Sequence, residues 1–304
     1  MRTRHHLSGF ISPLLFLALF FLLSCSTADT GTDALPGGNA VYYWRTEWQM
    51  DSIQRSFLQR HGVQRVYCRY FDVVMDTAMH QPMPNATIAF TDSVPQTLEL
   101  VPTVYITENC LHHVSSLSTD TLAARIVKRV VQMNQTNDLP PANELQIDCD
   151  YTSRSRDTYY ALLAAIREGA ARHGMRLSTT IRLHQLSMPA PPADYGVLML
   201  YNTGDPRRFA ERNPVLDERD VRPYADHLEP YPLPLAAAYP VYCWQRHIGG
   251  VRIEHTVDAA ELLAVKRLVE KRRPALSNTI IAYHLSKENI ERYSNDTYEA
   301  LFHH

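Results

Sequence analysis

The chain has 304 residues, of which 45% are hydrophobic and 20% are charged. Its formal net charge is −2 at pH 7, and Lys and Arg are scattered along it, so nothing indicates a nucleic-acid partner. The sequence contains no CxxC pair and no His/Cys cluster, so we expect neither a bound metal nor a cofactor.

The first residues have the plan of a secretory signal. Arg2 and Arg4 form a basic start, and the apolar run after them, "GFISPLLFLALFFLLSCS", is too short and too early for a typical membrane span. The sequence "LLSC" (22–25) near its end resembles the lipobox of bacterial lipoproteins. The resemblance implies that the signal peptide (1–24) is removed, that Cys25 is lipidated, and that the protein is anchored to a membrane of the bacterial cell envelope. The alternatives are an ordinary signal peptide with a chance cysteine, or an uncleaved anchor.

A polar linker separates this start from the rest of the chain. Residues 25–39 have too little apolar surface to pack, which predicts a flexible tether. Residues 40–304 are enough for one large domain with a substantial core.

Strand-like and helical segments alternate along this domain. Eight short runs have the composition of strands: 40–44, 65–71, 100–106, 144–150, 176–183, 196–201, 234–242 and 278–285. Several are apolar almost throughout, as expected for parallel strands covered on both faces. Four amphipathic segments predict helices: 51–62, 119–135, 156–174 and 258–274.

This alternation predicts an α/β fold, a single (β/α)₈ TIM barrel. An open doubly wound sheet is the competing architecture. No Gly-rich phosphate loop follows the first strand, which counts against a dinucleotide-binding version of that sheet. The irregular segment 202–233 is rich in Pro, Arg, Asp and Glu, and we expect it to cover one end of the barrel.

Besides Cys25, the chain has four cysteines. Cys68, Cys110, Cys149 and Cys243 are an even number in a chain that we expect to be exported, so disulfides are one alternative. Three of the four lie in apolar, strand-like runs, which favours buried free thiols.

The fourth predicted strand ends in two carboxylates. Asp148 and Asp150 are two residues apart, so they share a face of the strand, with Cα atoms roughly 6.6 Å apart. In barrels the active site lies at the C-terminal ends of the strands, and two carboxylates so close disturb each other's ionisation. We therefore identify them as candidate catalytic residues. In the structural alternative, Asp150 caps the following turn while Asp148 pairs with an arginine such as Arg69 or Arg182.

Aromatic and polar residues recur at the other strand ends. Flat rings stack on sugar faces while polar groups fix the hydroxyls, so this recurrence indicates a glycan site. Any one of these rings, taken singly, fits a core or rim position equally well. The candidate substrate-binding residues are Trp44, Arg45, Tyr70, Glu108, Arg182, His184, Tyr201, Asn202 and Trp244.

Two of these strand ends resemble those of family-18 glycoside hydrolases, the chitinase-like barrels. "LQIDCDYT" (145–152) is similar to the family's D-G-x-D-x-D-x-E, in which the final Glu is the general acid, and Asp148 and Asp150 match the central aspartates. "MLYN" (199–202) is similar to the sixth-strand Met-x-Tyr-Asp, whose Tyr and Asp hold an acetamido group. The departures are Leu145 and Gln146 for the first Asp-Gly, Thr152 for the acid, and Asn202 for the last Asp.

Trp244 is a candidate for the part of the family's floor tryptophan, although no motif fixes it. The whole pattern ("WRTEW", "QIDCDY", "LHQLSMP", "LMLYNTGD") resembles more closely a set of uncharacterised bacterial barrel proteins, domain of unknown function 3142. That resemblance covers nearly all of 41–290 and implies a fold and a site location, not a reaction.

Two hypotheses for function follow. In the first, the protein is a glycoside hydrolase-like enzyme that uses Asp148 or Asp150 with a second carboxyl from Glu108 or Glu47. In the second, it is a non-catalytic glycan-binding or envelope scaffold protein that has lost the acid. Both place a glycan or other small polar ligand at the mouth of the barrel.

Overall fold

The computed structural model describes residue 35 and the ranges 37–76, 78–114 and 116–303. The predicted signal peptide, Cys25 and most of the predicted tether therefore lie outside the described residues. Within the described ranges, no helix is both long enough and apolar enough to cross a membrane.

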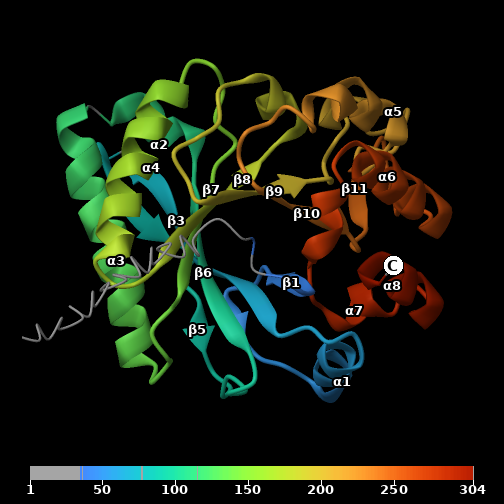
Figure 1. The fold of residues 1–304 in the computed structure, drawn as a ribbon, viewed down its shortest axis with the longest axis horizontal. Coiled ribbons are helices and arrows are strands. Elements are labelled where there is room, and N and C mark those ends of the chain that lie inside the picture. The colour runs from blue at the N-terminus through green and yellow to red at the C-terminus, as the bar shows by residue number, and fades with distance from the viewer. Residues whose placement is uncertain (1–34, 36, 77, 115, 304) are drawn as a thin grey trace, which may run out of the picture. The chain divides into compact units, whose positions relative to one another are not determined.

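Eight parallel strands close into a barrel (Figure 1). In hydrogen-bonding order they are β1 (Ala40–Tyr43), β3 (Arg65–Asp76), β6 (Glu99–Ile106), β7 (Glu144–Asp148), β8 (Arg176–Ile181), β9 (Tyr195–Met199), β10 (Leu235–Pro240) and β13 (Ile280–Tyr283). Because β1 pairs with both β3 and β13, the ring of strands is complete. The predicted barrel is confirmed, and the open sheet is excluded.

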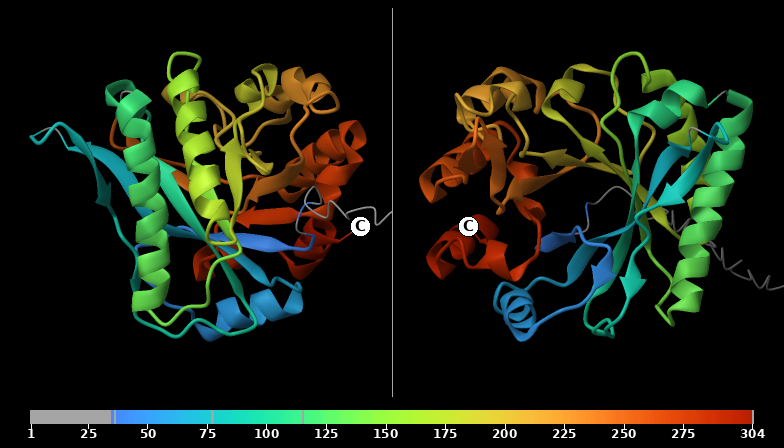
Figure 2. Two further views of the ribbon diagram at one scale, coloured as in Figure 1. Left: turned by 60° about the vertical axis from the view of Figure 1, so that its left-hand side comes forward. Right: turned by 180° about the vertical axis from the view of Figure 1, so that it is seen from behind.

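Helices surround the barrel. The four predicted helices correspond to α1 (Ser52–Arg60), α3 (Ser116–Thr136), α4 (Arg156–Ala171) and α6 (Ala259–Arg272). α3 and α4 pack side by side outside the strands (Figure 2). A fifth helix, α8 (Asn295–Phe302), was not predicted. The shorter helical segments are α2 (Glu108–His113), α5 (Glu218–Val221), α7 (Lys287–Ile290), η1 (Leu183–Ser187), η2 (Pro206–Arg208), η3 (Arg222–His227) and η4 (Pro274–Asn278).

The boundaries of α1 have local causes. Asp51 Oδ1 accepts from the Gln54 backbone N–H at 2.8 Å, and Gln54 Oε1 accepts from the Asp51 N–H at 2.9 Å, which completes a capping box. The helix ends before Gly62, whose φ of +61° suits a glycine and turns the chain toward β3.

Five further strands lie outside the barrel ring. β4 (Gln81–Asn85) pairs antiparallel with the end of β3, and β11 (Trp244–Ile248) pairs with β12 (Val251–His255) through a Gly-Gly turn with positive φ at both glycines. β2 (Glu47–Trp48) pairs with β5 (Ala89–Phe90). The sequence did not reveal β4, β11 and β12 because most of their residues are exposed and lack an apolar alternation.

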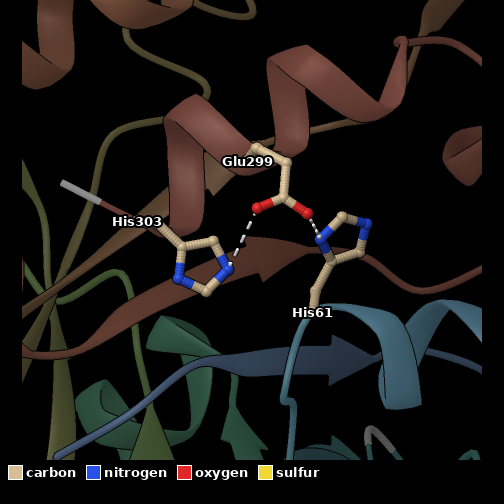
Figure 3. A group of neighbouring side chains, drawn as sticks. All are labelled: His61, Glu299 and His303. Atoms are coloured by element: carbon tan, nitrogen blue, oxygen red, sulfur yellow. Dashed lines mark ion pairs between the residues drawn. The ribbon is translucent and has the colours of Figure 1, made fainter.

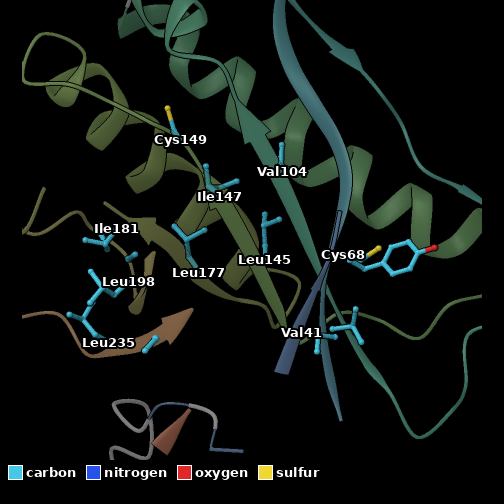
Figure 4. Packing of buried hydrophobic residues seen from close by; sticks show 14 of the residues in the cluster. Val41, Cys68, Val104, Leu145, Ile147, Cys149, Leu177, Ile181, Leu198 and Leu235 are labelled. Atoms are coloured by element: carbon cyan, nitrogen blue, oxygen red, sulfur yellow. The ribbon is translucent and has the colours of Figure 1, made fainter. Parts of the chain in front are cut away.

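Successive side chains of β7 and the residue after it point alternately to the surrounding helices and to the interior of the barrel. Leu145, Ile147 and Cys149 belong to the large core between the strands and the helices (Figure 4). Gln146 points the other way, into the barrel, where its Oε1 accepts from Tyr42 Oη at 2.7 Å and its Nε2 donates to Ser178 Oγ at 3.3 Å. The interior of the barrel therefore contains hydrogen-bonded polar side chains as well as aromatic rings.

The segment 202–233 is not a simple cover. Its second half packs against the outer helix α6: the Glu218 N–H donates to Glu261 Oε1 at 2.6 Å, and Arg273 donates to the Leu228 carbonyl at 3.0 Å. Its first half contacts the β11–β12 hairpin, where His255 Nε2 lies 2.7 Å from the Phe209 carbonyl oxygen. The apolar residues buried in this segment require such partners. With the short helical segments η2, α5 and η3, the segment fills the outer position between β9 and β10 that a long helix fills after other strands, which the expectation of a cover did not include.

The four cysteines in the described part of the chain are free thiols. Cys68, Cys110 and Cys149 are buried, and burial raises the pKa of the Cys149 thiol well above its usual value. Cys243 is only partly buried and lies between β10 and β11 rather than in a strand, contrary to the sequence prediction.

Candidate functional site

Asp148 is held inside the mouth of the barrel. It ends β7, the fourth barrel strand, is 6% exposed, and accepts a hydrogen bond from Thr180 Oγ1 at 2.6 Å. Burial, and then the nearby charge of Asp150, raise the pKa of Asp148 to about 6, although Arg182 and Thr180 oppose the shift. Tyr105, opposite Asp148 on β6, also has its pKa raised to about 12 by burial and by the two aspartates.

Asp150 forms an ion pair at the rim. Its Oδ1 lies 2.5 Å from Arg182 Nε, and its side chain is 48% exposed while that of Arg182 is 18% exposed. Arg182 Nη1 also donates to the Tyr201 carbonyl at 3.3 Å. Thr180 and Arg182 are two residues apart, so one face of the chain at the end of β8 supplies a partner to each aspartate.

A bulge in β3 brings a second ion pair to the mouth. Arg69 pairs with Thr103 and Phe71 with Val104, so Tyr70 is the extra residue. Because of this extra residue, Arg69 and Asp72 face the same side, and two nitrogens of Arg69 donate to the two carboxylate oxygens of Asp72.

Tyr70 is therefore not part of the site, and its prediction as a substrate-binding residue is wrong. It is fully buried on the helix side of β3, where its hydroxyl donates to Asn134 Oδ1 of α3 at 2.9 Å. The sequence alternation alone could not show this, because the bulge changes which residues share a face.

Four aromatic side chains, Trp44, Tyr201, Tyr242 and Tyr283, form a group at the mouth. The rings of Tyr201 and Tyr283 are stacked with centroids 4.3 Å apart, and Trp44 and Tyr242 lie 5.9 and 5.6 Å from Tyr283. Tyr242 also donates a hydrogen bond to Asn202 Oδ1. Tyr283, which ends the eighth strand, is central to the group but is not among the predicted substrate-binding residues.

Beside this group is a cavity of about 390 Å³, which lies within the size range of ligand sites. Its lining residues come from the segment that follows β1 and includes β2, and from β3: Trp44, Arg45, Thr46, Glu47, Gln49 and Arg69. A larger cavity of about 880 Å³ lies at the opposite, N-terminal ends of the strands, next to Gln64, Leu98 and Asn143. Barrel enzymes do not place their chemistry at that end, so we assign the site to the mouth.

Thr152 contacts a carboxylate at the start of α2, just after the neighbouring strand β6. Its Oγ1 donates to Glu108 Oε1 at 2.6 Å, and Ser155 Oγ donates to the same oxygen at 2.9 Å. Partial burial by itself raises the pKa of Glu108, but these hydrogen bonds and nearby His112 bring it below its usual value. Glu108 is thus ionised at neutral pH and serves as an acceptor.

The remaining predicted residues lie beyond the ends of the barrel strands. Trp244 begins β11, where its ring packs against Phe209 at 5.5 Å, so it is not the floor of the barrel. His184 is exposed in η1, and Arg45 is exposed with an ion pair to Glu288 at 3.6 Å. Trp244, His184 and Arg45 all come after the barrel strands, and the pattern of strands in the sequence does not predict the path of the chain there.

Several solved structures share this fold. A chitinase from Chromobacterium violaceum ATCC 12472 is 13% identical, with 87% of this chain and 98% of that chain covered and a TM-score of 0.56. A family-18 chitinase from the chitin utilization locus of Flavobacterium johnsoniae is 9% identical, with 88% and 93% covered and a TM-score of 0.58. The barrel thus has the fold of family-18 chitinases.

A chitinase-like agglutinin from Robinia pseudoacacia is 12% identical, with coverage of 86% and 98% and a TM-score of 0.56. No family model matches the sequence, and no curated protein is similar to it in sequence. At these identities the likeness concerns the fold alone.

Proposed function

We propose that this protein binds a glycan at the mouth of the barrel and does not hydrolyse it. The observation that carries the proposal is Thr152. This residue stands where family-18 glycoside hydrolases, which the sequence resembles, have their general acid, and its hydroxyl donates a hydrogen bond to Glu108. A threonine cannot donate a proton to a leaving group as a carboxylic acid does. The fold is similar to that of chitinases and of a chitinase-like agglutinin, which is compatible both with glycan binding alone and with hydrolysis.

The carboxylates at the mouth are better placed to accept hydrogen bonds than to supply protons. Asp150 is paired with Arg182, Glu108 is held ionised by two hydroxyl donors, and Asp148 is 6% exposed beneath them. Ionised carboxylates beside aromatic rings suit the hydroxyl and ring faces of a sugar. The 390 Å³ cavity between Trp44 and Arg69 gives room for a ring to approach.

Hydrolysis is the second candidate, and one contact favours it. The Glu108 carboxylate lies 2.6 Å from Thr152 Oγ1, so a carboxyl from another strand end reaches the place of the missing acid. If ligand binding displaced Thr152 and Ser155, the pKa of Glu108 would rise, and it could act as the acid opposite Asp150.

One experiment separates the two candidates. The whole protein is applied to a glycan array that includes chito-oligosaccharides, and the same sugars are then assayed for released product. We expect saturable binding, at least tenfold weaker in Trp44→Ala, with no product from the parent. Glu168→Gln, which changes an exposed carboxylate on the outer side of α4, serves as the control.

Product formation that is lost in Glu108→Gln would establish hydrolysis and overturn the proposal. Failure of the parent to bind any glycan would reject both candidates.

We also propose that the protein is a lipoprotein of the bacterial envelope, with its barrel tethered through Cys25. The lipobox-like sequence at 22–25 supports this proposal. The motifs across 41–290 support a second proposal, that the chain is a member of the domain of unknown function 3142 family.

A further inference from the structure

His61, Glu299 and His303 are potential metal ligands whose side chains lie close together (Figure 3). His61 follows α1, directly before the chain enters β3, while Glu299 and His303 lie one helical turn apart at the end of α8. His61 Nδ1 is 3.5 Å from Glu299 Oε1, and His303 Nε2 is 3.5 Å from Glu299 Oε2. One ligand atom from each of the three residues lies within 4.8 Å of the others.

The imidazole ring of His61 is buried, and the part of the chain that the structure describes gives it no hydrogen bond. It is 0% exposed, and neither ring nitrogen has a hydrogen-bond partner among the described residues. The ring packs against Phe57, Tyr298 and Phe302, with centroid distances of 4.7, 5.5 and 5.6 Å. A buried imidazole without a hydrogen bond costs free energy, so a ligand at Nδ1 would remove a penalty that packing alone leaves in place.

The nearby carboxylate does not fill this role. Glu299 Oε1 lies 3.5 Å from His61 Nδ1, but the two atoms do not form a hydrogen bond. A metal ion between them can bind the imidazole nitrogen and the carboxylate oxygen together.

We propose that His61, Glu299 and His303 form a binding site for a divalent transition-metal ion, with zinc as the representative ion. Two imidazoles and one carboxylate are a ligand set that Zn²⁺ accepts. Tetrahedral bonds of about 2.0–2.1 Å place neighbouring ligand atoms roughly 3.3 Å apart. Each imidazole nitrogen already lies 3.5 Å from one of the two carboxylate oxygens of Glu299, so small rotations of the half-exposed side chains complete this geometry. Glu299 and His303 are 51% and 49% exposed, so their side chains can rotate to complete the geometry, and water can take the fourth position.

The position of the site suggests its purpose. α1 follows the first barrel strand and α8 follows the last, so an ion held by both helices ties the beginning of the barrel to its end. The site lies at the N-terminal ends of the strands, away from Asp148, which points to a stabilising role. We expected no metal from the sequence because His61 lies far along the chain from Glu299 and His303.

The test measures zinc binding by the whole protein, by competition with a chromophoric chelator, together with its melting temperature with and without Zn²⁺. We expect one ion per chain and a higher melting temperature with zinc. Glu299→Gln and His303→Gln should each weaken binding at least tenfold and abolish the shift in melting temperature. Both side chains are half-exposed, so these variants should fold.

Asp296→Asn removes a carboxylate from the same helix, and His173→Gln removes an exposed imidazole elsewhere. Both controls should bind zinc within twofold of the parent. The proposal fails if the parent binds no zinc, if Glu299→Gln or His303→Gln keeps the parent's affinity, or if a control loses as much affinity as the site variants.

Discussion

At the scale of single residues, the two aspartates of β7 have different surroundings and so different properties. Asp148 is buried with one neutral donor, Thr180, whereas Asp150 is half-exposed with a charged partner, Arg182. The alternation of β7 predicted that both would face the mouth, and Asp148 does so. Thr180 could have been found by the same argument, since it precedes Arg182 by two residues on β8.

We predict that Asp148→Asn stabilises the protein at neutral pH. The pKa of Asp148 is about 6 in the folded chain and about 3.9 in an unfolded one, so the folded state binds the proton more tightly. The parent therefore loses stability as the pH rises from about 4 to about 6, by an amount on the order of 3 kcal/mol. Asparagine avoids that loss and can still accept from Thr180.

Urea unfolding at pH 4 and pH 7 checks this. The two proteins should have similar stability at pH 4, and the variant should be the more stable at pH 7. Asp150→Asn is the matched control: it breaks the pair with Arg182 and should not be stabilised in this way. A variant less stable than the parent at pH 7 would mean that Arg182 and Thr180 outweigh the cost of burying the Asp148 charge.

At the scale of elements, apolar runs located all eight barrel strands, because each is covered on both faces. The exposed strands β4, β11 and β12 were missed, since their sequences carry no such pattern. The bulge in β3 was missed for a different reason: one extra residue leaves the composition of the strand unchanged but moves Tyr70 to the helix side. Because of the bulge, Tyr70 faces the helices, and Arg69 and Asp72 are the residues of β3 that face the candidate site.

Tyr70→Phe tests that assignment. The Tyr70 hydroxyl bonds to Asn134 in a buried contact between β3 and α3, so its removal should lower the free energy of unfolding by about 1 kcal/mol. Glycan binding should be unchanged. The measurements are urea unfolding and the glycan assay described above, with Trp44→Ala as the variant that should show the opposite pattern. Weaker glycan binding with unchanged stability would return Tyr70 to the site.

At the scale of the whole molecule, the architecture was predictable and the reaction was not. The order of strands and helices determines a barrel, and a barrel determines which end bears a site. Whether that site is catalytic depends on a few side chains such as Thr152 and Glu108, which come from different strand ends. Their contact follows from the course of two loops, and strand periodicity does not determine that course.

The proposed anchor gives a prediction at this scale. The parent, expressed in a bacterium, should fractionate with membranes, and Cys25→Ala should be released into the soluble fraction, because the attached acyl chains supply the affinity. Cys243→Ala, which removes a partly buried thiol from the barrel, should remain with the membranes. If Cys25→Ala stayed in the membrane fraction, the N-terminal segment would be an uncleaved anchor.

The pairing of β1 with both β3 and β13 also constrains the order of events during biosynthesis. β1 is among the first parts of the domain to be made, yet one of its edges has no partner until β13 has been synthesised. Contacts between such distant segments form slowly, and an unpaired edge attracts other strands. The nascent chain must therefore stay incomplete, with that edge open, until nearly the whole domain has emerged. Such delayed closure is compatible with the proposed export, in which the chain would cross a membrane before it folds.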